Sequence, residues 1–323
     1  MSIKIEKSLD NVPYIQLGSH QLRLDLEDLT PEEKQRAEQE LRETPENVKY
    51  ALEKLKELLG DEPDFFVPID DDIFLTKFLR PCRFIPENAF RIMRKYYGFK
   101  IKYPKFSCNI TPAGIRHVFD KEIFKMLPTR TSNGCRIMIV SLEKWDPKQV
   151  KLEDLFKAVM VAMEIAMLEP KTQCGGVEII LDTKGLALIH IYQITPTLAK
   201  IILEWIQECC AVRLKGIHVI NQPLIFNMGY KIFKPFLGER LKKALFFHGH
   251  NAENLLKRIS PESLPPKYGG TADIPEYPGS LFSDMLFYYE KNFEEYNTYG
   301  YKEDTKTVQT FNDTKEEISV TCH

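Results

Sequence analysis

Residues 216–221 read Gly-Ile-His-Val-Ile-Asn, a short β-branched run bounded by turn-forming residues that predicts a buried strand. Similar runs alternate with helical patterns on either side of it, with strands expected at residues 136–141, 177–182 and 244–248, and helices at residues 152–168, 195–210 and 223–237. Strands separated by helices join through right-handed crossovers and form a largely parallel sheet. The sequence therefore predicts an α/β domain in which helices flank this sheet.

A different pattern precedes this domain, because the first 105 residues are predicted to be all-α. Thr30 before Pro31 is a strong helix start, and Glu33 can complete a capping box. Further helical patterns follow at residues 45–60, 73–80 and 86–97. We therefore expect three parts: a helical domain over residues 1–105, an α/β domain with a C-terminal helix over residues 106–298, and a polar, disordered tail over residues 299–323.

Composition limits the classes of protein to which the chain can belong. A net charge of −2 over 323 residues gives the whole molecule no reason to bind nucleic acid. No apolar run approaches the ~20 residues that span a bilayer, and the first ten residues lack the apolar core of a signal peptide. The seven cysteines, an odd number without a CxxC pattern, favour a reduced cytoplasmic protein, with a secreted protein as the alternative.

The motifs of common α/β enzymes are absent from the sequence. It contains no GxGxxG, GxxxxGK[ST] or GxSxG pattern, so nucleotide cradles and the hydrolase elbow are not expected. His248 and His250 lack a neighbouring cluster of metal ligands, so no metal site is predicted. We interpret His190 and His218 as core histidines bonded to the backbone and Asp182 as a capping residue, in preference to catalytic roles. The sequence therefore predicts neither an enzyme nor a cofactor.

Residues 223–237 form an unusual helical segment, because apolar side chains surround nearly the whole helix. Phe226, Tyr230 and Phe233 share one face, while Met228 and Ile232 lie on another. A helix of this kind is either buried or meets a second apolar phase. Composition alone leaves two interpretations open: a buried crossover helix, or a lid with one face over a ligand and the other toward lipid.

The same part of the chain is locally basic. Residues 213–243 contain seven lysines and arginines and a single acidic residue, Glu239, although the whole chain is slightly acidic. A basic cluster beside an apolar helix suits an anionic membrane surface. The alternative is a solvated basic surface without a partner.

Several sequence blocks resemble those of the CRAL-TRIO lipid-binding family over about residues 30–295. These blocks are residues 72–80, Trp145-Asp146-Pro147, residues 193–196, residues 216–221, Lys234-Pro235-Phe236-Leu237 and residues 264–270. Within the family, the sequence is most similar to the tocopherol and retinaldehyde carriers. The resemblance implies a CRAL-TRIO domain with a mobile lid helix over a hydrophobic cavity, preceded by a helical domain. Two arginines of the family fall at Cys82 and Ala244 here.

The resemblance also implies which residues form the sites. The implied ligand-binding residues are Phe156, Val159, Met163, Val177, Ile179, Leu181, Ile202, Ile206, Val212, Leu214, Ile217, Phe226 and Phe233. The implied phosphoinositide-binding residues are Arg213, Lys215, Arg240 and Lys242. The alternative for the first set is that these residues simply pack the core of the sheet. The lining has no charged anchor, which favours a tocopherol, retinoid or other neutral isoprenoid over a phospholipid headgroup.

Together these observations predict a carrier. The protein is expected to bind a hydrophobic small molecule and transfer it between membranes, with release at membranes that contain phosphoinositides. It would be cytoplasmic and associate with membranes peripherally and reversibly. A signalling or trafficking module regulated by a phospholipid is the main alternative, and an enzyme acting on lipid is a less favoured one.

Overall fold

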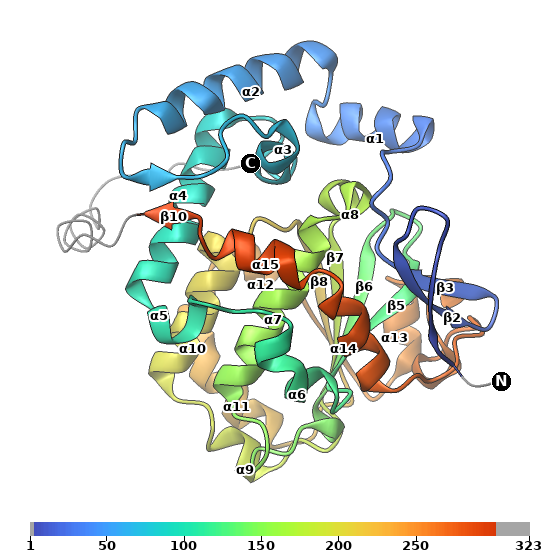
Figure 1. Ribbon diagram of the computed structural model, residues 1–323. Coiled ribbons are helices and arrows are strands. Elements are labelled where there is room, and N and C mark those ends of the chain that lie inside the picture. The colour runs from blue at the N-terminus through green and yellow to red at the C-terminus, as the bar shows by residue number, and fades with distance from the viewer. Residues whose placement is uncertain (1–2, 302–323) are drawn as a thin grey trace.

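A five-stranded sheet forms the centre of the computed structural model, which describes residues 3–301 (Figure 1). The strand order is β5 (Phe124–Arg130), β6 (Arg136–Ser141), β7 (Val177–Asp182), β8 (Leu214–Ile220) and β9 (Leu245–Gly249). Strands β6 to β9 are parallel, and β5 runs antiparallel along one edge. The predicted α/β fold with a largely parallel sheet is therefore confirmed.

Helices cover both faces of this sheet. On one face lie α7 (Leu152–Met167), α9 (Leu188–Ile191), α10 (Pro196–Glu204), α11 (Phe226–Phe233) and α12 (Glu239–Lys243). The opposite face is covered by α13 (Ala252–Leu256) and the chain that follows, where Leu255 and Ile259 pack against Ile137 and Ile180. After α10 the chain continues as one π-helical turn, Trp205–Cys209, in place of the regular helix expected up to residue 210.

The helices expected in the N-terminal region are present. They are α1 (Pro31–Leu41), α2 (Pro45–Gly60), α3 (Asp72–Leu79) and α4 (Pro86–Lys102), with the short helices α5 (Pro104–Ser107) and α6 (Arg116–Phe119) leading into the sheet. Thr30 caps α1, and the complete capping box with Glu33 is formed. Thr44 caps α2 in the same way through the backbone N–H of Asn47. These local signals fix the helix starts without help from the rest of the fold.

The prediction of an all-α N-terminal region is wrong for residues 5–23. These residues form a three-stranded antiparallel sheet of β1 (Ile5–Lys7), β2 (Pro13–Leu17) and β3 (His20–Arg23). The alternation decides it, because Ile15 and Leu17 are buried while Gln16 between them is exposed. This small sheet packs against β5, so it adjoins the α/β part of the molecule instead of the helices that follow it.

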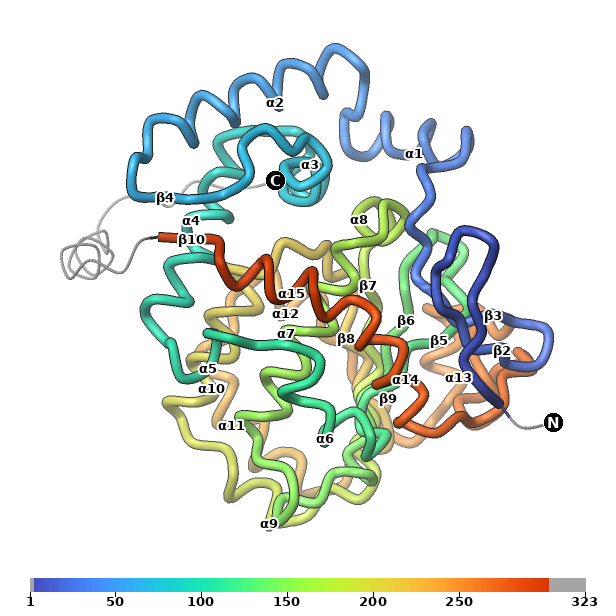
Figure 2. The backbone as a smooth tube through the Cα atoms, in the orientation of Figure 1, coloured from blue at the N-terminus to red at the C-terminus, as the bar shows by residue number. Residues whose placement is uncertain are grey.

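The described chain ends back at the N-terminal helices. After α14 (Gly279–Phe287) and α15 (Glu290–Tyr296), strand β10 (Gly300–Tyr301) pairs with β4 (Phe65–Phe66). Figure 2 shows this last segment beside α4. The tail predicted from residue 299 therefore starts with an ordered strand pair, and residues 302–323 lie outside the described residues.

A buried ion pair joins the beginning of β6 to the segment just before α8. Arg136 opens β6 and is 1 % exposed, while Glu169 precedes α8 (Pro170–Gly175) and is 0 % exposed. The Nε of Arg136 donates to Glu169 Oε2 at 3.1 Å, and a second guanidinium nitrogen contacts the other oxygen. Burial alone would raise the pKa of Glu169, but the charges of Arg136 and Arg130 outweigh it and hold the pKa at about 2.

Neutralising this carboxylate should destabilise the whole fold. Glu169→Gln leaves the buried Arg136 guanidinium with only the partly exposed Asp25 as counter-charge, at 3.3 Å, so the free energy of unfolding should fall by about 3 kcal/mol. Urea denaturation measures this change. The control is Glu57→Gln, which removes the exposed pair with Lys54 and should cost less than about 1 kcal/mol. Equal losses in the two variants would contradict the structural role of the Arg136–Glu169 pair.

Candidate ligand-binding site

The two faces of the central sheet are packed differently. On the face toward α13, Ile137 and Ile180 are both 0 % exposed. On the face toward α7 and α10, Ile179 and Leu181 of the middle strand β7 stay partly exposed, although helices cover them. A central strand between two helical layers normally buries both of its faces completely. Along β7, side chains on the α7 side are therefore packed less completely than Ile180 on the α13 side.

The predicted ligand-binding residues gather on this loosely packed face. Nine of the thirteen are only partly buried: Val159, Ile179, Leu181, Ile202, Ile206, Leu214, Ile217, Phe226 and Phe233. The other four, Phe156, Met163, Val177 and Val212, are fully buried in the main core. The register explains the convergence on the sheet, because Ile179 pairs with Ile217 and both project to the same side.

Helix α11 closes this face with unequal contacts along its length. Its fully buried residue is Gly229, where an added Cβ would lie 3.0 Å from the Cδ1 of Ile191. The rings of Phe226 and Tyr230 contact Phe247 of the edge strand β9, with centroids 6.0 and 5.3 Å away, although Phe247 is itself 45 % exposed. On its outer side Met228 is 51 % exposed. The helix is thus not buried all round, which favours the lid interpretation of its composition.

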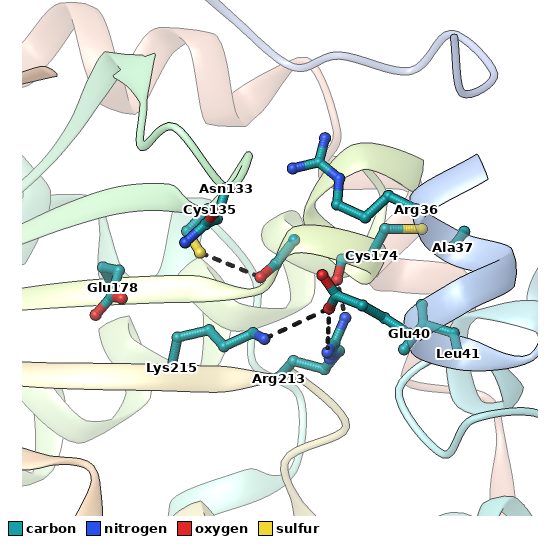
Figure 3. Close-up of a pocket in the computed structure, with 11 residues that line it drawn as sticks. Arg36, Ala37, Glu40, Leu41, Asn133, Cys135, Cys174, Glu178, Arg213 and Lys215 are labelled. Atoms are coloured by element: carbon teal, nitrogen blue, oxygen red, sulfur yellow. Dashed lines mark hydrogen bonds and ion pairs between the residues drawn. The ribbon is translucent and has the colours of Figure 1, made fainter. Parts of the chain in front are cut away.

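The predicted phosphoinositide-binding residues separate into two pairs. Arg213 and Lys215 face a polar hollow between β8 and α1, where both approach the carboxylate of Glu40, at 3.0 and 3.8 Å (Figure 3). Arg240 and Lys242 lie on α12 and are exposed to solvent. The hollow of Figure 3 includes the first pair and does not include the second.

Residues 120–270 match the CRAL/TRIO domain family. This part of the chain is therefore identified as a CRAL/TRIO domain. Over 284 residues it is 28 % identical to Clavesin-2 of Homo sapiens, covering 87 % of this chain and 86 % of the relative. Over 237 residues it is 29 % identical to the alpha-tocopherol transfer protein-like protein of Mus musculus, covering 73 % of this chain and 69 % of the relative.

Comparison with solved structures gives a weaker match. The crystal structure of Sfh5 matches with a TM-score of 0.43 and 14 % identity, covering 77 % of this chain and 98 % of that chain. The CRAL/TRIO family is one of lipid binding and transfer, so the match places residues 120–270 with lipid-binding proteins and not with enzymes. Within residues 3–301, no helix is both long and apolar enough to cross a membrane.

The histidines of the CRAL/TRIO domain have structural partners. His190 bonds to the backbone through both ring nitrogens, as predicted, with Nε2 2.9 Å from the carbonyl of Trp145. The expectation of backbone bonding is wrong for His218, which lies between Glu178 Oε2 and His248 Nε2 at 2.9 Å each. No sequence pattern predicted this row of side-chain contacts, because Glu178, His218 and His248 lie on three different strands. No group of three or more metal-ligating side chains occurs within residues 3–301.

Asp182 also has the structural role predicted from its place at the end of β7. Its Oδ1 accepts a hydrogen bond from the backbone N–H of Lys184 at 3.1 Å and another from the Asn221 side chain at 2.8 Å. These bonds tie the ends of β7 and β8 together. The carboxylate thus holds the two loops that lead into α9 and α11.

The buried His248 should make the fold sensitive to mild acid. Burial, His218 and Arg258 lower the pKa of His248 from 6.5 to about 4, so the unfolded chain binds the proton more tightly than the folded one. The free energy of unfolding should therefore fall by about 2 kcal/mol between about pH 7 and about pH 5. Urea denaturation across this range measures the slope.

Two glutamine variants test the assignment of this slope. His248→Gln removes the titrating group and should flatten the dependence of unfolding free energy on pH. His250→Gln removes an exposed histidine two residues away and should leave the slope of the unmodified protein. The same slope in all three proteins would show that His248 is not the group responsible.

Proposed function

We propose that this CRAL/TRIO protein binds one neutral hydrophobic molecule between its sheet and α11. The observation that carries the proposal is the unequal packing of the two faces of β7. Ile180 is fully buried on one face, while Ile179 and Leu181 on the other face are partly exposed. Apolar side chains left partly uncovered inside a fold gain ~25 cal/mol for each Å² that a ligand removes from water. A ligand of isoprenoid size therefore adds stability that the empty protein lacks.

The chemistry of the lining favours a neutral ligand of tocopherol or retinoid type. All thirteen residues proposed for the lining have apolar side chains. Beside them lies one polar group without a partner: the indole N–H of Trp205 is buried and has no acceptor within residues 3–301. The Trp205 ring packs edge-on against Phe156, at 5.8 Å between centroids. This unsatisfied donor favours a ligand that carries a hydroxyl or carbonyl oxygen over a plain hydrocarbon.

Release of the ligand would take place at an anionic membrane. Near the start of α11, Leu224 and Met228 are exposed, and Leu188, Ile189 and Tyr192 at the adjacent α9 are exposed as well. Such an apolar patch on a lid helix can enter the lipid interface, where opening the lid no longer exposes apolar surface to water. Exposed cations follow along α11 and α12, as anionic headgroups require. The protein would act in the cytoplasm and bind membranes peripherally and reversibly.

A second candidate function is a signalling or trafficking module regulated by a phospholipid. The observation that favours it is the hollow at Arg213 and Lys215, which is polar and lies at the beginnings of β7 and β8 instead of beneath α11. Cations in such a hollow suit a phosphorylated headgroup. A carrier and a regulated module differ in what they hold under α11, so the identity of that ligand decides between them.

Filling the space on the α7 side should weaken ligand binding without unfolding the protein. Leu181→Phe adds volume where packing is loose, so it should cost less than about 1 kcal/mol of unfolding free energy. It should weaken binding of a fluorescent tocopherol or retinoid analogue by about ten-fold. Equilibrium fluorescence titration of these analogues and of a fluorescent phospholipid measures the effect.

The neighbouring Ile180→Phe is the matched control, because the same ring is added to the opposite, sealed face. It should lower the free energy of unfolding by about 1–3 kcal/mol and leave ligand affinity unchanged. Equal destabilisation by the two variants would mean that the α7 side is ordinary core. Binding of the phospholipid alone would overturn the neutral-ligand proposal and favour the regulated module.

The two basic pairs should contribute differently to membrane docking. Each lysine or arginine close to an anionic surface adds about 1 kcal/mol, so removing all four should weaken docking by up to about 4 kcal/mol. Arg240→Ala with Lys242→Ala removes exposed charge and should weaken binding to all anionic vesicles. Arg213→Ala with Lys215→Ala should weaken binding most on vesicles that contain phosphatidylinositol bisphosphate. Vesicle co-sedimentation measures both losses.

Neutral vesicles provide the reference for these measurements. Raised salt should weaken docking on anionic vesicles, because it shortens the Debye length. If the fourfold variant bound anionic vesicles as well as the unmodified protein does, the basic residues would have no part in docking. Equally strong binding to neutral vesicles would also overturn the proposal.

A further inference from the structure

Helix α1 forms one wall of the polar hollow shown in Figure 3. The hollow has a volume of about 160 Å³ and lies where α1 and α8 meet the beginnings of β7 and β8. Arg36 and Glu40 project from α1, and Arg213 and Lys215 project from β8 and the turn before it. The N-terminal helical region therefore supplies charged groups to a site that the sequence placed in the α/β domain alone.

Glu40 neutralises two cations of this hollow at once. Its Oε2 lies 3.0 Å from Arg213 Nη2 and 3.8 Å from Lys215 Nζ. Burial acts to raise the pKa of Glu40, but Arg213 and Lys215 outweigh it and lower the pKa, so the carboxylate is ionised at neutral pH. Because its side chain is still 43 % exposed, Glu40 can leave both partners by rotating into solvent.

Arg36 lies one helical turn before Glu40, and its positive charge is not paired with a carboxylate in the described residues. Its guanidinium reaches across to the turn between β5 and β6, where its nitrogens lie 3.6 Å from the position of a Cβ added at Gly134. Gly134 has φ +78°, so this close approach uses a position without a side chain. In the described part of the chain, Arg36 forms neither a hydrogen bond nor an ion pair. Its charge therefore remains available to a ligand.

The second carboxylate of the hollow does not compete for these cations. Glu178 Oε2 is bonded to His218 Nε2 at 2.9 Å, which holds it toward the interior of the sheet. An added Cβ at Gly216 would lie 2.3 Å from this Oε2, so the glycine leaves room for the Glu178–His218 contact. Glu40 is thus the acid that occupies the cations of the site.

We propose that Glu40 is an internal counter-ion that keeps this site closed, that a phosphomonoester replaces it, and that Arg36 is the third cation of the opened site. A phosphate carries about −1.5 to −2 charge and three acceptor oxygens, against one charge on a carboxylate. One guanidinium group can donate to two phosphate oxygens at once. Arg36 and Arg213 can therefore hold one phosphate from two sides. The proposal rests on the proposed docking at phosphoinositides and names the residues that regulate it.

Removing the counter-ion should open the site. Glu40→Gln frees Arg213 and Lys215, so binding to phosphatidylcholine vesicles with phosphatidylinositol bisphosphate should tighten by about five-fold. Glu38→Gln changes net charge equally on the same helix, without an ion pair in the described chain, and should tighten binding less than about two-fold. Co-sedimentation with vesicles of equal charge made with phosphatidylserine shows whether the gain is specific to phosphomonoesters.

Removing the third cation should have the opposite effect. Arg36→Ala should weaken binding to the bisphosphate vesicles by about five-fold and change binding to phosphatidylserine vesicles much less. Lys49→Ala on α2 is the matched control, since it removes an exposed cation away from the hollow. Thermal unfolding of each variant checks that α1 remains folded.

The outcomes separate this proposal from the docking proposal. If the unmodified protein favours bisphosphate vesicles while Glu40→Gln and Glu38→Gln behave alike, the counter-ion proposal fails and docking stands. Calorimetric titration with soluble inositol trisphosphate supplies the other case. If Glu40→Gln binds this headgroup more tightly but no variant favours the vesicles, the counter-ion proposal stands, the ligand is a free phosphorylated molecule and docking fails. No tightening on either probe overturns the counter-ion proposal.

Discussion

The buried pair of Arg136 and Glu169 positions much of what surrounds it. Arg136 begins β6 and Glu169 precedes α8, so their contact joins the beginning of β6 to the segment that leads into β7. The same carboxylate accepts a hydrogen bond from the backbone N–H of Asp25 at 2.9 Å, just before the chain enters α1. This desolvated interaction helps to place α1 over the hollow of Figure 3, together with the packing of Ala37 and Leu41 against Cys174 of α8.

Much of the sheet could be predicted from the sequence because its inner strands are apolar on both faces. The expected limits of β6 and β7 match those observed, since each is a short β-branched run between clear breaks. Strand β5 gave no such signal, because Pro128 and three polar residues interrupt it at the edge of the sheet, where such residues are tolerated. The strands before residue 24 were missed because they are too short to show more than two alternations.

The candidate site was predictable on its apolar side and not on its polar side. Alternation along β7 was enough to group Ile179 with Leu181, and the resemblance added the helices that face them. The partners of the basic residues lie far away in the sequence, as Glu40 is 173 positions from Arg213. No local pattern encodes such a contact, which arises only when α1 folds back over the sheet. The expected single basic surface therefore became two separate pairs.

The pairing of β10 with β4 has a consequence for the order in which the molecule assembles. Tyr301 stacks on Phe65 with ring centroids 4.6 Å apart, so the aromatic core of the first helices takes a side chain from the end of the described chain. During synthesis, α2 to α4 leave the ribosome long before this partner exists. The N-terminal helices complete their packing only after the whole α/β unit has been made, and closing so large a loop is a slow step. The pairing of β10 with β4 is therefore expected to be a late step in the folding of this protein.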